Sequence, residues 1–251
     1  MKNACKVAIV TGASRGIGAA TAKRLAADGF AVCVNYLKDL TAAEDTVRQI
    51  EKRGGVAVAI QADVSKENQV QRLFSDTEKF IGKPTALVNN AGILFTQSKL
   101  VELDAERINK VLLTNVTGSF LCAKHAVLVM SAEFGGEGGV IVNVSSAASR
   151  LGSAGEYVDY AASKGAIDTM TIGLSKEVAS QGIRVNAVRP GCIYTQMHAS
   201  GGEPDRVNRL KSTFPMQRGG EVDEVAAAIA WLVSDESSYS TGSFIDVSGG
   251  R

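Results

Sequence analysis

The sequence predicts an α/β protein with a doubly wound parallel sheet of about seven strands and helices on both faces. Short apolar runs such as Val7–Val10 recur along the chain, as is typical of strands buried on both faces. Helical segments alternate strictly with these runs, which implies right-handed crossovers and parallel strands. Polar or glycine-rich motifs follow several predicted strand ends, where sheets of this Rossmann type bind their ligands.

The elements follow one another in a regular order. The predicted strands are residues 7–10, 31–34, 56–60, 86–88, 140–144, 183–188 and 244–246. The predicted helices are residues 19–28, 41–53, 65–80, 104–131, a stretch through Tyr160 and Lys164 to about 180, and 222–233. Gly29 and Gly182 end two of the helices, and Thr41 with Glu44 forms a capping box that opens the second.

No linker or internal repeat divides the chain, so residues 1–251 are predicted to form a single cofactor-binding and catalytic domain. Residues 191–220 contain no clear periodic pattern, and we predict an irregular segment there. Its part from about 192 to 215 is expected to cover the substrate, with Gly201 and Gly202 providing flexibility.

Composition argues against several classes of partner. The chain has 27 basic and 26 acidic residues and a net charge of +1, so no basic field favours nucleic acid or an anionic membrane. The four cysteines form no CxxC pair, and the two histidines lack metal-ligand spacing. The first apolar run is too short for a signal-peptide core. We therefore predict a cytoplasmic protein without a bound metal.

A glycine loop follows the first predicted strand. Gly12, Gly16 and Gly18 lie where this strand gives way to a helix. Glycines allow the backbone to approach a pyrophosphate, and a helix N-terminus presents free N–H groups to it. The spacing differs from GxGxxG, and a tight strand–helix turn without a ligand is the alternative.

The second predicted strand ends in neutral residues. Many NAD enzymes place an acid there to bind the ribose, whereas this strand ends in Asn35 and Tyr36. Asp39 lies beyond the strand end, where a local turn role is expected. Arg15 and Lys38 are cations that suit a 2′-phosphate, so the sequence favours NADP(H) over NAD(H).

Polar residues also follow the third and fourth strands. Asp63, followed by Val64, could accept a hydrogen bond from an adenine amino group or could cap the next helix. The sequence from Asn89 to Gly92 offers amides and small residues that admit a ribose, although a plain turn would have the same composition.

The catalytic candidates follow the fifth strand. Tyr160 and Lys164 are four residues apart and would share one helix face. A nearby ammonium would lower the phenol pKa from ~10, which suits proton exchange with a substrate oxygen. Ser146 could hold a substrate carbonyl by a hydrogen bond, and Ser145 is the alternative. A lone tyrosine–lysine pair on a surface helix would be uninformative.

Together these motifs resemble those of the short-chain dehydrogenase/reductase family in its single-domain form. The resemblance covers nearly the whole chain and is carried by an ordered set: Thr11-Gly12-Ala13-Ser14-Arg15-Gly16-Ile17-Gly18, Asn89-Asn90-Ala91-Gly92, Asn115, Ser146, Tyr160-Ala161-Ala162-Ser163-Lys164, Pro190-Gly191 with Thr195, and Gly249-Gly250. Each piece alone is weak, but the order of all of them is specific.

The resemblance implies a role for each catalytic residue. Tyr160 would be the general acid/base, Lys164 would bind the nicotinamide ribose, and Ser146 would orient the carbonyl. Asn115 would hold a water that links Lys164 to solvent. Tyr157 has no lysine four residues later and is the weaker candidate for the acid/base. The step from Ser146 to Tyr160 is fourteen residues, about one more than is common, and we expect the extra residue in the loop over residues 150–158, which borders the substrate.

The resemblance also implies a cofactor site and an assembly. The implied cofactor-binding residues are Gly12, Ser14, Arg15, Gly16, Ile17, Gly18, Asn35, Tyr36, Asp63, Val64, Asn89, Ala91, Gly92, Tyr160, Lys164, Pro190, Gly191, Ile193 and Thr195. A homotetramer would pair through the long helices beginning near Asp104 and Tyr157 and through the C-terminal strand.

The predicted function is hydride transfer between NADP(H) and a carbonyl or alcohol substrate, such as a ketone, a sugar or an acyl carbonyl. A non-catalytic NADP-binding sensor or scaffold is the alternative from another class. An epimerase or dehydratase using the same tyrosine is less favoured, because such relatives have a separate substrate domain.

Overall fold

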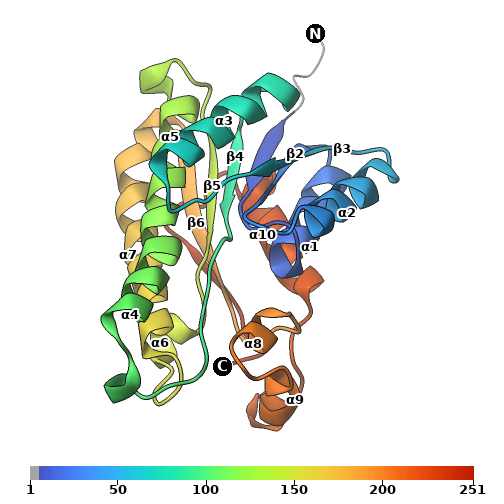
Figure 1. Ribbon diagram of the computed structural model, residues 1–251. Coiled ribbons are helices and arrows are strands. Elements are labelled where there is room, and N and C mark those ends of the chain that lie inside the picture. The colour runs from blue at the N-terminus through green and yellow to red at the C-terminus, as the bar shows by residue number, and fades with distance from the viewer. Residues whose placement is uncertain (1–5) are drawn as a thin grey trace.

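The computed structural model describes residues 6–251, and it confirms the predicted sheet (Figure 1). The described residues form seven parallel strands in the order β3-β2-β1-β4-β5-β6-β7. The strands are β1 (Val7–Val10), β2 (Ala31–Tyr36), β3 (Val56–Gln61), β4 (Ala86–Asn89), β5 (Gly139–Val144), β6 (Ile183–Pro190) and β7 (Phe244–Val247). The order reverses direction between β1 and β4, where doubly wound folds bind their ligands.

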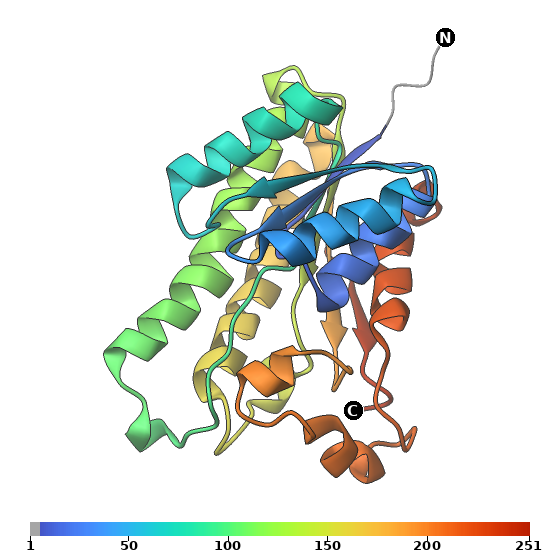
Figure 2. The ribbon, with the colours of Figure 1, turned by 45° about the vertical axis from the view of Figure 1, so that its right-hand side comes forward.

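Helices cover both faces of the sheet, as predicted (Figures 1 and 2). One layer contains α1 (Gly16–Ala27), α2 (Leu40–Glu51) and α10 (Val222–Val233). The other contains α3 (Glu67–Ile81), α4 (Ala105–Leu112), α5 (Gly118–Met130) and α7 (Val158–Val178). Each layer buries its own apolar cluster against the alternate side chains of the central strands. The central sheet that carries the site is therefore packed on both faces.

The N-terminus of α2 differs from the prediction. The helix begins at Leu40, and Asp39 is its N-cap, with a carboxylate oxygen 3.0 Å from the backbone nitrogen of Ala42. The capping box predicted at Thr41 and Glu44 is therefore wrong, because both residues lie inside the helix. The local turn role expected for Asp39 is confirmed.

The long helix predicted over residues 104–131 is not regular throughout. A π-helical turn over residues 113–117 separates α4 from α5. Such turns put one extra residue into the helix and are frequent at functional sites. Asn115 lies in this turn and is fully buried.

The segment over residues 191–220 also departs from the prediction of an irregular loop. It contains two short helices, α8 (Met197–Ser200) and α9 (Arg206–Leu210). Both lie below the carboxyl ends of the strands in Figure 1. Gly201 follows α8 and lies against Leu94 and Tyr157, so the segment is folded onto the body of the domain.

One helical run, Ala105–Met130, is apolar and long enough to cross a membrane by length and composition alone. It packs against α3, α7 and strands β4 and β5, and Cys122, Ala126 and Met130 belong to the apolar cluster on that face. A core helix has the same composition, and the packing identifies this run as one.

The cysteines are consistent with free thiols. Cys33 and Cys122 are buried and unoxidised, Cys192 is partly exposed, and Cys5 lies outside the described residues. Burial raises the pKa of the Cys33 and Cys122 thiols to about 12, so both remain protonated and unreactive.

Candidate active site

Two adjoining cavities open at the carboxyl ends of the strands. The first has a volume of about 420 Å³ and lies over the ends of β1 to β4, and the second has a volume of about 350 Å³ and lies over β5 and β6. Ile17, Asn90, Leu94, Thr195 and Met197 line both. The cavities therefore form a continuous site at the position predicted for a doubly wound sheet.

The predicted residues divide between these cavities. The first is lined by Gly12, Ser14, Arg15, Gly16, Ile17, Gly18, Asn35, Tyr36, Asp63, Val64, Ala91, Gly92 and Thr195. The second is lined by Ser146, Tyr160, Lys164, Pro190, Gly191, Ile193 and Thr195. Asn89 and Asn115 line neither cavity, because both side chains are buried behind them.

The glycine loop is shaped for close backbone approach. Gly12 and Gly16 adopt φ angles of +61° and +57°, which other residues rarely adopt. A Cβ on Gly18 would lie 2.4 Å from the carbonyl oxygen of Gly12. No side chain caps the first turn of α1, so its free N–H groups face the first cavity and can bind an anion.

Asn35 shapes this loop from below. Its Oδ1 accepts a hydrogen bond from the Gly12 nitrogen, and its Nδ2 donates to the carbonyl oxygens of Ile60 and Ala62. The side chain is 2% exposed. The polar atoms of Asn35 are therefore bonded to the backbone of the protein itself. Asn35 affects the cavity indirectly, by holding the glycine loop in position.

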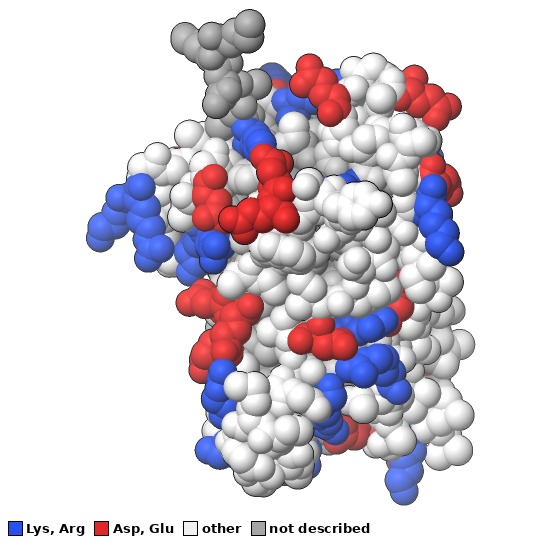
Figure 3. Space-filling model, turned by 180° about the vertical axis from the view of Figure 1, so that it is seen from behind, with Lys and Arg blue, Asp and Glu red and all other residues white. Residues whose placement is uncertain are grey.

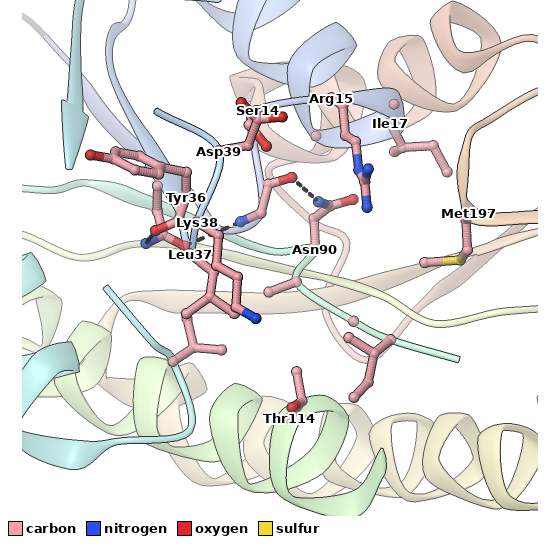
Figure 4. A pocket seen from close by; sticks show the side chains of 18 of the residues that line it. Ser14, Arg15, Ile17, Tyr36, Leu37, Lys38, Asp39, Asn90, Thr114 and Met197 are labelled. Carbon is pink, nitrogen blue, oxygen red and sulfur yellow. Dashed lines mark hydrogen bonds between the residues drawn. The ribbon is translucent and has the colours of Figure 1, made fainter. Parts of the chain in front are cut away.

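The cationic side chains at the far end of the first cavity are not neutralised. Within residues 6–251, neither Arg15 nor Lys38 forms an ion pair with an acid. Figure 4 shows both side chains at the cavity, one from the start of α1 and the other from the residues after β2. The site thus offers two free positive charges near a helix N-terminus.

Asp63 is both a cavity residue and a turn residue. Its Oδ1 accepts hydrogen bonds from the Ser65 nitrogen at 3.0 Å and from the Ser65 hydroxyl at 2.7 Å. It does not cap α3, because Lys66 occupies the N-cap position. The role as a helix cap considered from the sequence is therefore wrong.

The two asparagines after β4 have different roles. Asn89 is 4% exposed and donates from Nδ2 to Asn143 Oδ1 at 3.0 Å, which joins β4 to β5. Asn90 lines both cavities and donates to the carbonyl oxygens of Thr11 and Gly12, the second of these bonds being drawn in Figure 4. Asn89 was predicted as a cofactor-binding residue and Asn90 was not, because the sequence alone does not show which of the two side chains faces the cavities.

Tyr160, Lys164 and Ser146 meet in the second cavity. Tyr160 and Lys164 lie on one face of α7, and Ser146 follows β5. The Ser146 side chain lies close enough to Tyr160 to lower its pKa, and its hydroxyl oxygen accepts a hydrogen bond from the Ala148 nitrogen at 3.1 Å. The Lys164 Nζ donates to the Val144 carbonyl oxygen at 2.7 Å and lies 5.6 Å from the centre of the Tyr160 ring.

The acidities of this pair differ from the expectation. Burial raises the pKa of Tyr160 to about 12, an effect that the Ser146 hydrogen bond partly opposes. Burial also lowers the pKa of Lys164 to about 8, which the Asp168 carboxylate partly opposes. The predicted lowering of the Tyr160 pKa by Lys164 is therefore wrong in this state of the protein, because removal from water outweighs a cation directed at the Val144 carbonyl.

The structure distinguishes between the two serines. The Ser145 hydroxyl donates to the Asp168 carboxylate at 2.6 Å and also to the Lys164 carbonyl oxygen. Ser146 has its hydroxyl beside Tyr160. Ser146 is thus the serine whose side chain can meet a substrate oxygen.

Asn115 supports the site from the π-helical turn. Its amide forms two hydrogen bonds with the backbone of Ile93, at 2.8 and 3.0 Å, and a third with the Ser163 hydroxyl. A Cβ placed on Gly92 would lie 3.5 Å from Asn115 Oδ1 and 3.6 Å from Lys164 Nζ. The Asn115 and Lys164 side chains therefore both lie next to Gly92.

Tyr157 is the N-cap of α7 and is bonded to the segment over residues 191–220. It is 4% exposed, its hydroxyl donates to the Gly201 carbonyl oxygen, and the Arg206 guanidinium lies 5.1 Å from its ring centre. Arg206 is itself buried and pairs with Glu156 and Glu203. Arg206 and Glu156 line the second cavity, and the sequence offered no signal for them, since they are far apart along the chain.

No group of three or more potential metal ligands occurs among residues 6–251. The exposed charges are also mixed. On the face shown in Figure 3, acidic and basic side chains alternate with uncharged surface. This face offers no continuous basic patch of the kind that would grip a nucleic acid.

Comparison with known proteins agrees with this geometry. The sequence family described as Enoyl-(Acyl carrier protein) reductase matches residues 12–251. The uncharacterized oxidoreductase YgfF of Escherichia coli (strain K12) is 63% identical and covers 98% of this chain and 99% of its own length. Glucose 1-dehydrogenase 2 of Bacillus subtilis (strain 168) is 39% identical and covers 98% of this chain and 94% of its own. The crystal structure of a short-chain dehydrogenase from Burkholderia cenocepacia J2315 in complex with NADP is 34% identical, covers 99% of both chains and superposes with a TM-score of 0.89.

Proposed function

The chain belongs to the short-chain dehydrogenase/reductase family, and from this premise we propose that it is an NADP(H)-dependent reductase of a small carbonyl compound. The observation that carries the proposal is the meeting of Ser146, Tyr160 and Lys164 in a cavity that adjoins the glycine loop. Bound NADP(H) would supply or accept the hydride.

The residues of the second cavity fit a proton donor for a carbonyl oxygen. Ser146 would hold this oxygen with its hydroxyl, and Tyr160 would donate its phenolic proton to it. Because burial holds the pKa of Tyr160 at about 12, the tyrosine is protonated at neutral pH. This is the form that a reduction requires, because the phenolic proton is then available for the substrate oxygen.

Lys164 would provide the positive charge of the site. At neutral pH a lysine with a pKa of about 8 is mostly protonated, so it favours negative charge developing on the neighbouring oxygens. Asn115 would keep Lys164 and the residues around Gly92 in place through its bonds to Ile93. In this account Asn115 holds the shape of the site and Tyr160 moves the proton.

The first cavity fits a dinucleotide with a 2′-phosphate. The glycine loop and the uncapped start of α1 suit a pyrophosphate. Arg15 and Lys38 form no ion pair among the described residues and can bind a further phosphate. Asp39 also lines this cavity, and its carboxylate accepts a hydrogen bond from the Ala42 nitrogen at the N-cap of α2. The NADP bound by the Burkholderia cenocepacia relative supports the same choice of cofactor.

The proposed assembly is a homotetramer in the cytoplasm. Large apolar side chains are exposed along α4, the π turn and α5, among them Leu112, Leu113 and Phe120. A patch of this kind commonly marks a protein interface, and it lies on the helices through which family members pair. Residues 192–215 would cover the substrate in each subunit.

Cofactor choice is tested by titrating NADPH and NADH into the protein and following cofactor fluorescence. We expect tighter binding of NADPH, and we expect Arg15→Ala and Lys38→Ala each to weaken NADPH about tenfold or more while leaving NADH nearly unchanged. Lys52→Ala is the matched control, because Lys52 is an exposed cation at the end of α2 that does not line the cavity. Tighter binding of NADH would overturn the NADP(H) assignment.

Activity is tested with a panel of ketones, sugars, alcohols and acyl thioesters, following the absorbance of the reduced cofactor. Ser146→Ala should lower kcat on any substrate found by about a hundredfold, because it removes a hydrogen bond to the reacting oxygen. Tight NADPH binding with no turnover of any panel member would favour the non-catalytic sensor instead.

A further inference from the structure

A partly buried ion pair lies next to the proposed catalytic residues. Asp168 is on α7, four residues after Lys164, and Arg189 is on β6. The Arg189 Nε donates to Asp168 Oδ2 at 3.0 Å, and the two side chains are only 16% and 13% exposed. The function proposed above uses neither residue, although withdrawing two charges from water in this way costs desolvation energy.

Asp168 is bonded to the segment that carries the catalytic serine. The Ser145 hydroxyl donates to Asp168 Oδ1 at 2.6 Å and to the Lys164 carbonyl oxygen at 3.2 Å. The Ser145 nitrogen donates to the Val188 carbonyl oxygen on β6. Ser145 therefore joins the end of β5 to both α7 and β6, one residue before Ser146.

Arg189 is itself fixed from the opposite side. Its guanidinium stacks on Phe244 at 3.9 Å from the ring centre, and it lies 3.9 Å from the Asp246 carboxylate. Both of these residues belong to β7. The Asp168 carboxylate is thus held by a cation that is anchored on the sheet, so neither partner of the bond can turn freely.

We propose that Asp168 and Arg189 are positioning residues of the active site: through Ser145 they set Ser146 against α7, and Asp168 presents a fixed negative charge to Lys164. The inference rests on the proposed function, because it concerns the same three catalytic side chains. Neither Asp168 nor Arg189 lines either cavity, so both act through other residues.

Few other charges surround Lys164. On its own helix it faces Tyr160 and Asp168, and β6 contributes Arg189 through the Asp168 bond. The end of β5 and the π turn present only the uncharged Ser145, Ser146 and Asn115 to this centre. The titratable and charged groups across the second cavity are Glu156, Tyr157, Cys192, His198, Arg206 and Arg251.

The acidity of Lys164 agrees with this arrangement. Burial lowers the Lys164 pKa, and the Asp168 carboxylate is the group that raises it again. Asp159 provides a matched comparison: it is a buried carboxylate on the same helix that pairs with Arg107, but it does not act on the acidity of Lys164 or Tyr160.

The test measures the Lys164 pKa directly, with neither cofactor nor substrate present. Carbon-13 NMR of protein labelled at the lysine ε-carbon reports each lysine, and the Lys164 signal is assigned by its loss in Lys164→Arg. The wild-type value should be about 8. Asp168→Asn should lower it by roughly half to one unit, because a nearby unit charge is lost at an effective dielectric constant near 20.

Two further variants separate charge from packing. Asp168→Glu retains the charge and should leave the Lys164 pKa near the wild-type value. Asp159→Asn removes a buried, paired carboxylate without touching Lys164, so it should reduce the melting temperature and leave that pKa unchanged. Equal titration of Lys164 in Asp168→Asn and wild type, or an equal shift in Asp159→Asn, would overturn the proposal.

If Asp168→Asn does not fold, Arg189→Gln decides the matter. Loss of this cation leaves the Asp168 charge uncompensated and should raise the Lys164 pKa, whereas an unchanged or lowered value would overturn the proposal. In an active preparation, the alkaline limb of kcat/KM should shift with the Lys164 pKa in every variant. A shifted Lys164 pKa without turnover of any substrate would support the effect of Asp168 on Lys164 and would refute the proposed reductase activity.

Discussion

Gly18→Ala tests whether the glycine loop is built to bind a phosphate. The new methyl carbon would lie 2.4 Å from the Gly12 carbonyl oxygen, 2.5 Å from the Asn90 Nδ2 and 2.9 Å from the Ala13 Cα. Two of these atoms are backbone, and the third is fixed by its hydrogen bonds to Thr11 and Gly12. The loop must therefore move to admit the methyl group.

The loss of stability that this movement causes can be bounded. Adding a methyl group to a close-packed site destabilises a protein by about 1–3 kcal/mol, and in a chain of this size each kcal/mol lowers the melting temperature by about 2–4 °C. Gly12 and Asn90 both line the first cavity, so their displacement also distorts the proposed phosphate site. We expect NADPH affinity to fall at least tenfold, which corresponds to about 1.4 kcal/mol.

The assay combines thermal unfolding with NADPH titration by fluorescence. Gly173→Ala is the control, because Gly173 lies on α7 and, apart from the adjacent helix backbone, no atom of the described residues lies within 4 Å of the added carbon. This control should gain about 0.5–1 kcal/mol of stability and bind NADPH as the wild type does. If Gly18→Ala keeps wild-type stability and NADPH affinity, the close packing is irrelevant to the site and the reasoning is refuted.

Three more predictions concern buried polar groups. Because burial lowers the Lys164 pKa to about 8 from 10.5, the charged lysine disfavours folding below pH 8. Lys164→Met should therefore raise the free energy of unfolding by up to about 3 kcal/mol at pH 7, and urea titrations should show the gain fading between pH 8 and 10.5; a less stable variant at pH 7 would contradict this. Arg107→Met leaves the Asp159 carboxylate buried without its partner, so chemical unfolding should show that the free energy of unfolding falls by about 3 kcal/mol. A decrease no larger than the contribution of a solvent-exposed ion pair would refute this prediction. Cys33 and Cys122 should resist thiol reagents in the folded protein and react once it is unfolded, as mass spectrometry after labelling would show; modification in the native state would speak against their burial.

The sheet could be predicted from the sequence because its strands are buried on both faces. Residues 7–10, 31–36 and 86–89 are apolar nearly throughout, and the continuous apolar runs mark them without any knowledge of their neighbours. The glycine loop and the spacing of Tyr160 and Lys164 are likewise local patterns. Local patterns were sufficient to predict the architecture and the helix that carries Tyr160 and Lys164.

The errors concern features that depend on distant contacts. The π turn around Asn115 is stabilised by bonds to Ile93, and helical periodicity alone does not reveal it. The choice between Asn89 and Asn90 depends on how the chain leaves β4. The pair of Asp168 and Arg189 joins a helix to a strand, so no local pattern in the sequence marks it.

The acidity of Tyr160 illustrates a different limit. The sequence showed a lysine four residues away and led to the expectation of a lowered pKa. Only the fold shows that the phenol is withdrawn from water and that Lys164 is directed at Val144. Burial is a property of the packed protein, and here it raises the Tyr160 pKa where a lowered value was expected.

The central claim is that Tyr160 transfers the proton, and Tyr160→Phe tests it most directly. With any substrate that the wild type reduces, this variant should lose about 10²–10⁴ in kcat while binding NADPH with nearly wild-type affinity. Tyr157→Phe is the control, because it removes a hydroxyl bonded to Gly201 on the covering segment, and it should retain most of the turnover. Wild-type turnover in Tyr160→Phe, or an equal loss in Tyr157→Phe, would contradict the account.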